Sequence, residues 1–184
     1  MLQLPEGYHL LFRLDLMKNK KQMLMVNGLA LIVAVGMVIP AVMRVSFMDC
    51  FGTQTMVKLL ALAVGSLAYI VLHELTHAVC MKHYSKEKVR FGFTGMYAFA
   101  GSDAYYYKKP YLVIALAPVV LWGVVLLILN WVLPVDWFWP VYAIQVSNLS
   151  GAAGDAYVTY RMWKLPDDVL VRDSGTAMNV YGKR

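Results

Sequence analysis

The residues best suited to chemistry in this 184-residue chain form the segment His73-Glu74-Leu75-Thr76-His77. Side chains four residues apart lie on the same face of an α-helix, so His73 and His77 are placed to bind one metal ion together. Glu74, offset by about 100° around the helix, is placed to act on a water beside that ion as a general base. Catalytic zinc usually takes three protein ligands and keeps a fourth position open. The pattern therefore predicts a zinc site that needs one further ligand.

Asp155 is the predicted third ligand. It is the only other acidic residue within a long apolar segment, and it ends the stretch Asn148-Leu-Ser-Gly-Ala-Ala-Gly-Asp155. At a helical rise of 1.5 Å per residue, His73 lies roughly 22 Å from Lys58, and Asp155 lies roughly 26 Å from Phe138. If both segments enter the membrane from the same side, these side chains reach similar depths. Cys80 shares the helix face of the histidines and offers a thiolate instead, but Asp155 would then be unexplained, so we expect Cys80 to pack.

Asn148 lies two turns before Asp155 on the same helix face. Its amide is suited to donating a hydrogen bond to a substrate oxyanion, or equally to bonding a neighbouring helix. Small residues between the two, such as Gly151 and Ala152, allow membrane helices to approach closely. A chance H-E-x-x-H match at a wetted helix end is the simplest alternative for the motif. The cost of ionisable groups in hydrocarbon, about 2.5–3.5 kcal/mol for Asp at mid-span, argues against it.

The segments that must position these residues are strongly apolar. Hydrophobic residues make up 60% of the chain and charged residues only 15%, whereas soluble domains carry about 25% charged residues. Four runs approach the roughly 20 residues needed to cross a bilayer, namely residues 23–43, 58–81, 111–133 and 137–160. We therefore predict an all-α membrane protein with four transmembrane helices in a single domain, residues 1–184. No cleavable signal peptide is evident, so the first run is expected to be a retained span.

The positive charges predict an orientation. Fifteen of the 17 Lys and Arg residues fall in the N-terminal segment, in residues 82–110 or in the C-terminal tail. Basic residues accumulate in cytoplasmic loops, so both termini and the 82–110 loop are expected in the cytoplasm, with the chain in the plasma (inner) membrane. The net charge of +6 is spread between apolar runs rather than clustered on one folded face, which disfavours nucleic acid as a partner.

Two polar segments predict a small β element at the cytoplasmic surface. Residues 89–101 combine β-branched and aromatic residues with glycines, which favours a strand or hairpin. An open strand edge can hold a substrate peptide in extended form, although a loop without substrate contact fits equally well. In the tail, residues 169–171 and 178–181 flank a turn at Asp173-Ser-Gly175. We expect these tail segments to pair with the 89–101 strand and to cover the site.

At these motifs the chain resembles membrane-embedded zinc metallopeptidases of the site-2 protease type, particularly the small zincin-peptidase family of four-span membrane proteins. The matching elements are HELTH at 73–77, NLSGAAGD at 148–155 and DSGTAMNVY at 173–181. The resemblance implies that His73 and His77 bind zinc, that Glu74 is the catalytic base and that Asp155 is the third ligand. Asp155 is preceded by Gly154 and followed by Ala156, which departs from the N-P-D-G or L-D-G pattern of site-2 proteases.

The predicted function is hydrolysis of a peptide bond in a membrane-bound or membrane-proximal polypeptide, near the cytoplasmic face, by a zinc metalloendopeptidase. The lipid bilayer and a membrane protein or peptide substrate are the expected partners. Two alternatives remain. A metal-binding or metal-transport protein also uses His and Asp inside spans, and Asn130 and Gln145 are the few polar residues that could line a path for the ion to the outside. A catalytically silent scaffold needs no bound metal.

Overall fold

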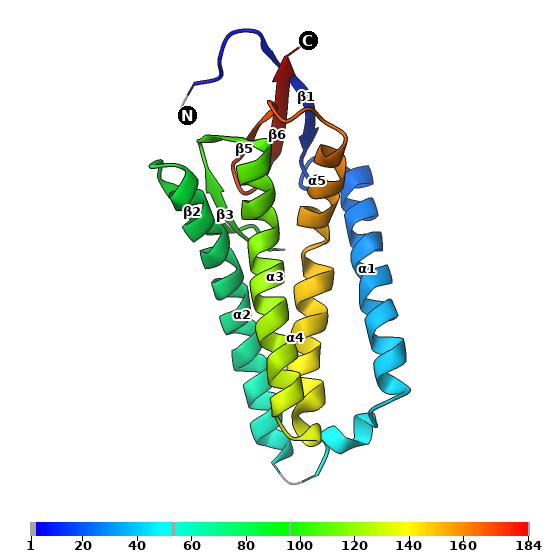
Figure 1. The fold of residues 1–184 in the computed structure, drawn as a ribbon. Coiled ribbons are helices and arrows are strands. Elements are labelled where there is room, and N and C mark those ends of the chain that lie inside the picture. The colour runs from blue at the N-terminus through cyan, green and yellow to red at the C-terminus, as the bar shows by residue number, and fades with distance from the viewer. Residues whose placement is uncertain (1–2, 53, 96, 184) are drawn as a thin grey trace.

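A computed structural model describes residues 3–52, 54–95 and 97–183 of the chain. Long helices run side by side along most of the molecule, and short strands gather at one end, where both termini also lie (Figure 1). The predicted combination of a mostly helical bundle with a small β element is thus confirmed.

Within residues 3–52, 54–95 and 97–183, three helices are long and apolar enough to cross a membrane: α1 (Lys20–Val42), α2 (Thr55–Tyr84) and α3 (Lys108–Val132). Each includes all or nearly all of one predicted run and begins about one turn earlier. The start of α1 is set by Asn19, whose side chain accepts a hydrogen bond from the Gln22 backbone N–H, a standard N-cap interaction. Most residues of the apolar windows in these helices lie on the molecular surface, as expected where lipid replaces protein as the neighbour.

The predicted fourth span, 137–160, differs in the structure. It forms two helices stacked end to end, α4 (Phe138–Gly151) and α5 (Ala153–Trp163), with the break at Ala152 (Figure 1). Gly151 and Gly154 flank this break, and glycine is among the weakest helix formers. Neither helix alone has the length of a span. Among the described residues, three helices therefore meet the criterion for crossing a membrane, and the count of four spans stays a prediction.

In the part of the chain that the structure describes, six strands cap the bundle. The larger sheet is antiparallel, in the order β1 (Tyr8–Leu14), β6 (Met178–Lys183), β5 (Leu170–Asp173) and β4 (Tyr105–Tyr107). A separate antiparallel hairpin is formed by β2 (Val89–Phe93) and β3 (Ala98–Ser102).

The predicted hairpin at residues 89–101 is therefore present, but the tail strands do not pair with it. Strand β5 pairs with β4, and β6 pairs with the N-terminal strand β1, so that Leu14 lies opposite Met178. The strand partners lie more than 60 residues apart in sequence, and local patterns do not specify such pairings.

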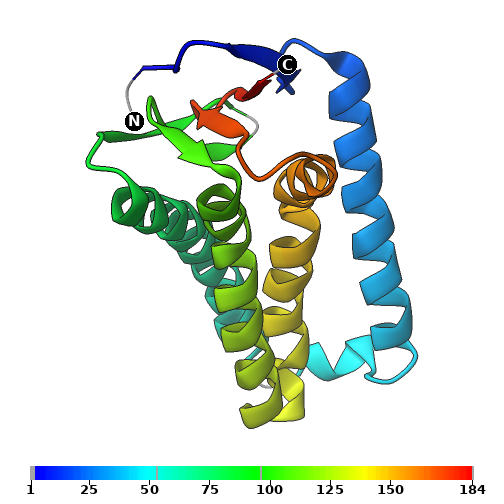
Figure 2. The ribbon, with the colours of Figure 1, turned by 45° about the horizontal axis from the view of Figure 1, so that its top comes forward.

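The buried core lies at the capped end, where the larger sheet meets the ends of α2, α3 and α5. Fully buried members include Met81, Ile114, Met162, Val171 and Val180. Helix α1 packs against α4 and α5, whereas α2 packs against α3 and α4 (Figure 2). Short 3-10 helices, η1 (Phe47–Cys50) and η2 (Val135–Trp137), lie in the connections at the opposite end.

Near η2, an ion pair joins Lys58 of α2 to Asp136 at 2.8 Å. The Lys58 side chain is only 3% exposed, so this pair ties the start of α2 to the connection between α3 and α4.

Candidate metal centre

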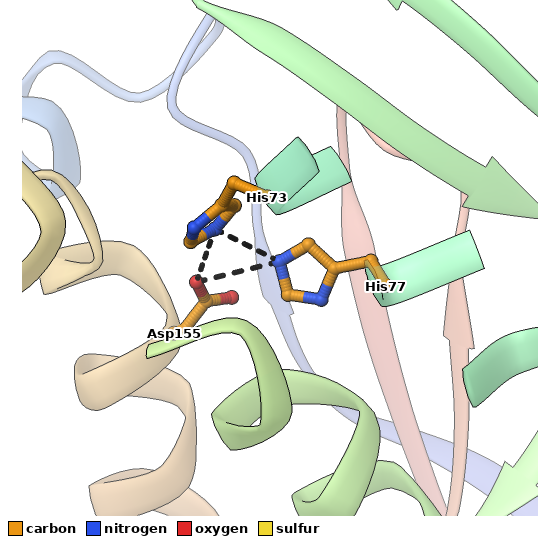
Figure 3. Close-up of side chains that lie close together, drawn as sticks. All are labelled: His73, His77 and Asp155. Carbon is orange, nitrogen blue, oxygen red and sulfur yellow. Dashed lines mark hydrogen bonds and ion pairs between the residues drawn. The ribbon is translucent and has the colours of Figure 1, made fainter. Parts of the chain in front are cut away.

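The two histidines and Asp155 come together at the capped end of the bundle (Figure 3). His73 and His77 project from one face of α2, and their Nε2 atoms lie 3.2 Å apart. One Asp155 carboxylate oxygen, Oδ2, lies 3.9 Å from the His73 Nε2 and 3.7 Å from the His77 Nε2. Asp155 lies in the first turn of α5, directly after the break at Ala152. The structure thus joins three residues that the sequence analysis selected as ligands.

The spacing of these atoms suits a tetrahedral metal ion. Zinc–nitrogen and zinc–oxygen bonds are about 2.0–2.2 Å long, so two donor atoms of a tetrahedral site lie about 3.4 Å apart. The separations of 3.2, 3.7 and 3.9 Å between the three donor atoms bracket that value. A fourth position would remain for water or substrate, as catalytic zinc requires.

The hydrogen bonding of His77 also fits a metal ligand. Its Nδ1 lies 2.8 Å from the backbone carbonyl oxygen of Ile114 on α3. A carbonyl only accepts hydrogen bonds, so His77 donates from Nδ1 and the neutral ring has a bare lone pair on Nε2. That lone pair faces the Asp155 carboxylate, which is itself an acceptor when ionised. Acceptors that converge without a donor between them are the groups that a cation brings together.

Glu74 lies on the same turn of α2, outside the group of three donor atoms. It is half-buried and lines one cavity together with Phe99 and Ala100 of β3. Strand β3 therefore borders the site.

The cavity, of about 570 Å³, contains the site and is lined by four of the five predicted site residues, His73, Glu74, His77 and Asp155. Its walls come from α1, α2, α3 and α5, from β3, and from the turn between β5 and β6. The turn contributes Asp173 and residues 175–178. The tail therefore lines the cavity, but it packs against β3 rather than pairing with it as predicted, and its covering of the site stays a prediction.

Two glycines permit this close packing. A Cβ on Gly101 of β3 would lie 2.2 Å from the backbone of Ser174. Gly175 has a φ of +85°, and a Cβ there would lie 2.1 Å from the ring of Phe99. Strand β3 and the turn can pack this closely only because both residues lack a side chain.

Asn148 occupies a different setting from the predicted oxyanion donor. Its side chain is fully buried, its Nδ2 donates to the backbone carbonyl oxygen of Val119 at 3.1 Å, and its Oδ1 accepts from the Tyr69 hydroxyl at 2.9 Å. It is not among the residues that line the cavity. Because its amide is engaged within the bundle, contact with a substrate is not supported, and of the two roles considered, bonding to a neighbouring helix describes it.

Cys80 is a half-buried free thiol that packs against the core. Among the described residues, the group of possible ligands comprises His73, His77 and Asp155 without Cys80.

Sequence reasoning gave no role to two tyrosines at the site. The Tyr69 hydroxyl lies 2.9 Å from the His73 Nδ1. Tyr111 of α3 lines the cavity and donates a short hydrogen bond to Asp173. The spacing of Tyr69, one helical turn before His73, was the available signal; the partner of Tyr111 lies 62 residues away and has no local signal.

Asp173 brings a third acidic group, after Glu74 and Asp155, into the cavity wall. Burial raises the pKa of its carboxyl above the ordinary value, although hydrogen bonds from Tyr111 and from the Gly175 backbone N–H oppose that rise.

Comparison with known proteins gives a family for this site. Residues 66–170, more than half of the chain, match the sequence model of a family described as "putative zincin peptidase". No curated protein matches the chain. No solved structure matches it either. The matched region contains the HELTH segment and Asp155, so the family assignment and the geometry concern the same part of the molecule. The chain belongs to the family of putative zincin peptidases.

Proposed function

We propose that this protein is a membrane-embedded zinc metallopeptidase of the site-2 protease type. The observation that carries the proposal is the convergence of His73 Nε2, His77 Nε2 and Asp155 Oδ2 beside Glu74 in one cavity. The three apolar helices α1, α2 and α3 support a location in a membrane. We further propose that α4 and α5 together make the fourth crossing, with both termini in the cytoplasm and the site near that face of the plasma (inner) membrane.

In this proposal the chain supplies the ligands and the base. His73, His77 and Asp155 hold the metal. Zinc, when bound there, would polarise the scissile carbonyl and lower the pKa of a bound water toward about 7. Glu74 accepts the proton of the attacking water and delivers it to the leaving amide nitrogen. Its position next to His73 on α2 places the carboxylate beside the three donor atoms without making it one of them.

The proposed substrate is a membrane-bound or membrane-proximal polypeptide in extended form. Ala100 of β3 and Glu74 line the same cavity, and within the described residues β3 pairs with β2 alone. An extended peptide can add to such an edge through backbone hydrogen bonds. This arrangement would bring a substrate carbonyl over the metal site from the sheet side of the cavity.

The Glu74→Gln variant tests the proposal. In detergent or lipid nanodiscs, the variant should keep the zinc content of the wild type and lose peptide cleavage by about 10²–10⁴-fold, the usual contribution of a general base. Glu6→Gln is the matched control, because Glu6 is exposed and lies far from the site in sequence; it should cleave at the wild-type rate. Cleavage by Glu74→Gln at the wild-type rate would exclude Glu74 as the base.

One observation favours the alternative of metal transport. Asn130 Oδ1 and Gln145 Oε1 are buried between helices and have no hydrogen-bond partner among the described residues. They lie along the part of α3 and α4 that leads away from the cap. Zinc flux into proteoliposomes that persists in Glu74→Gln, without chelator-sensitive cleavage by the wild type, would favour transport. If the purified wild type contains no zinc and cleaves no peptide, the remaining alternative is a catalytically silent scaffold.

A further inference from the structure

A chain of buried hydrogen bonds leads from His73 through three helices. The His73 Nδ1 lies 2.9 Å from the Tyr69 hydroxyl on α2, and this hydroxyl lies 2.9 Å from Asn148 Oδ1 on α4. Asn148 Nδ2 lies 3.1 Å from the Val119 carbonyl oxygen on α3.

The far end of this chain determines the direction of every bond in it. The Val119 carbonyl only accepts, so the Asn148 amide must turn its Nδ2 toward Val119 and its Oδ1 toward Tyr69. Because Oδ1 also only accepts, the single hydroxyl proton of Tyr69 is used in that bond. The Tyr69 oxygen is then an acceptor for His73, which must donate from Nδ1.

The consequence for His73 is a defined tautomer. With its proton on Nδ1, the neutral ring carries a bare lone pair on Nε2, the atom that faces Asp155 and His77. The Ile114 carbonyl imposes the same tautomer on His77. The two Nε2 atoms, 3.2 Å apart, are then both acceptors and cannot bond to each other, which leaves them directed at a shared cation.

We propose that Tyr69 and Asn148 are positioning residues that hold His73 in the Nδ1–H tautomer and direct its Nε2 toward the metal. This inference rests on the proposed function, because it takes His73 as a ligand. Partners of this kind fix the orientation of ligating histidines, and their loss typically costs 10–100-fold in metal affinity.

The surroundings of Asn148 suit this role. The side chain is fully buried, so water does not compete for its amide. A Cβ added at Gly123 of α3 would lie 3.2 Å from Asn148 Nδ2, so the glycine leaves the space that the amide occupies. The packing of α3 and α4 is thereby linked to the orientation of a ring on α2.

The test combines zinc affinity with a direct view of the tautomer. Zinc affinity, measured by chelator competition, should fall about 10–100-fold in Tyr69→Phe and in Asn148→Leu. The double variant should be no weaker than the weaker single variant, because both substitutions break one chain. Tyr142→Phe is the matched control: its hydroxyl bonds the Met37 carbonyl within the same bundle, and its loss should leave zinc affinity unchanged.

The tautomer is read by ¹⁵N NMR of histidine-labelled, metal-free protein. His73 should carry its proton on Nδ1 in the wild type and in Tyr142→Phe, and should populate both tautomers in Tyr69→Phe, while His77 stays unchanged. An Nε2–H tautomer of His73 in the wild type, or unchanged zinc affinity in both single variants, overturns the positioning role even if the wild type binds zinc and cleaves peptide. A wild type with the expected tautomer but no zinc overturns the proposed function instead.

Discussion

At the scale of single residues, the candidate site depends on a few side chains held by partners distant in sequence. His73 and His77 share a helix face by spacing alone, but the orientation of each ring depends on α3 and α4, through Ile114 for one and Asn148 for the other. The geometry of the site therefore depends on the residues that orient the histidine rings as well as on the proposed ligands.

Asp155 provides a prediction at this scale. Asp155→Ala removes one of three donors and should lower zinc content to well below one ion per chain at zinc concentrations that saturate the wild type. Metal analysis of the purified variant is the measurement. Asp49→Ala, a substitution in η1 at the opposite end of the bundle, is the control and should bind zinc normally. Undiminished zinc in Asp155→Ala would remove Asp155 from the proposed ligand set.

Asp173 provides a second prediction, on pH dependence. Its pKa in the folded protein is raised by burial, so the folded state binds the proton more tightly than the unfolded state. This contribution to stability is present below the ordinary pKa of 3.8 and is lost as the pH rises through the folded pKa.

Asp173→Asn should therefore become more stable relative to the wild type as the pH rises over that range, measured by thermal unfolding in detergent. Asp173→Ala leaves the buried Tyr111 hydroxyl without its acceptor and should cost about 1–3 kcal/mol. If the stability difference between Asp173→Asn and the wild type is the same at every pH, the raised pKa of Asp173 is contradicted.

At the scale of elements, the hairpin β2–β3 is joined to the larger sheet by one carboxylate. Asp103 lies 2.6 Å from Arg90 of β2 and 2.7 Å from Arg172 of β5. Hydrogen bonds from the two guanidinium groups lower the pKa of Asp103 to about 2. Asp103 directly follows β3, so the two contacts tie the hairpin β2–β3 to strand β5 of the tail.

Replacing Asp103 with Asn should weaken this connection only modestly, because the carboxylate is partly exposed and such ion pairs typically contribute about 0–1 kcal/mol. The depressed pKa means that the contribution is present above the ordinary value of 3.8 and is lost as the pH falls through about 2. Thermal unfolding should show a small loss for Asp103→Asn at pH 6 that shrinks toward pH 2. A stability difference between the wild type and Asp103→Asn that grows as the pH falls would contradict the lowered pKa of Asp103.

The contact between β3 and the turn at residues 173–178 gives a stronger prediction. Gly101→Ala places a methyl group 2.2 Å from the Ser174 backbone, so one backbone must move and the cavity wall with it. Overpacking of this kind typically costs about 1–3 kcal/mol. Gly36→Ala in α1 has no atom within 4 Å of the added Cβ and should be neutral or stabilising. Equal thermal stability of the two variants would mean that the close packing of strand and turn is not maintained in solution.

At the scale of the whole molecule, the arrangement separates an apolar bundle from a cap of strands that holds both termini. The core is concentrated at the cap, while the bundle exposes large apolar side chains along α1, α2 and α3. The candidate site lies where these two parts meet, in a cavity lined by residues of both.

The proposed orientation makes a prediction at this scale. With Cys50 and Cys80 replaced by serine, single cysteines at Glu6 and at Met48 should lie on opposite sides of the membrane. A membrane-impermeant thiol reagent added to intact cells should label the cysteine at position 48, and the cysteine at position 6 should react only after permeabilisation. The reverse pattern would place the site at the outer face, and labelling of both positions from outside would contradict an apolar bundle that spans the membrane.

The sequence by itself determined what local spacing records: four long apolar runs, of which three are single helices long enough to cross a membrane among the described residues, two imidazoles on one helix face, and a hairpin near residues 89–101. These features follow from periodicity and length, which each segment carries independently of the others. It did not reveal the break at Ala152, the pairing of the two termini or the burial of Asn148. Only the tertiary structure joined Tyr69 to Asn148 across 79 residues and placed the tail turn against β3. Asp155 was already selected from the sequence, and the structure added its distances of 3.9 and 3.7 Å to the two histidines. Such contacts depend on how distant segments pack against one another, and local periodicity contains no record of that packing.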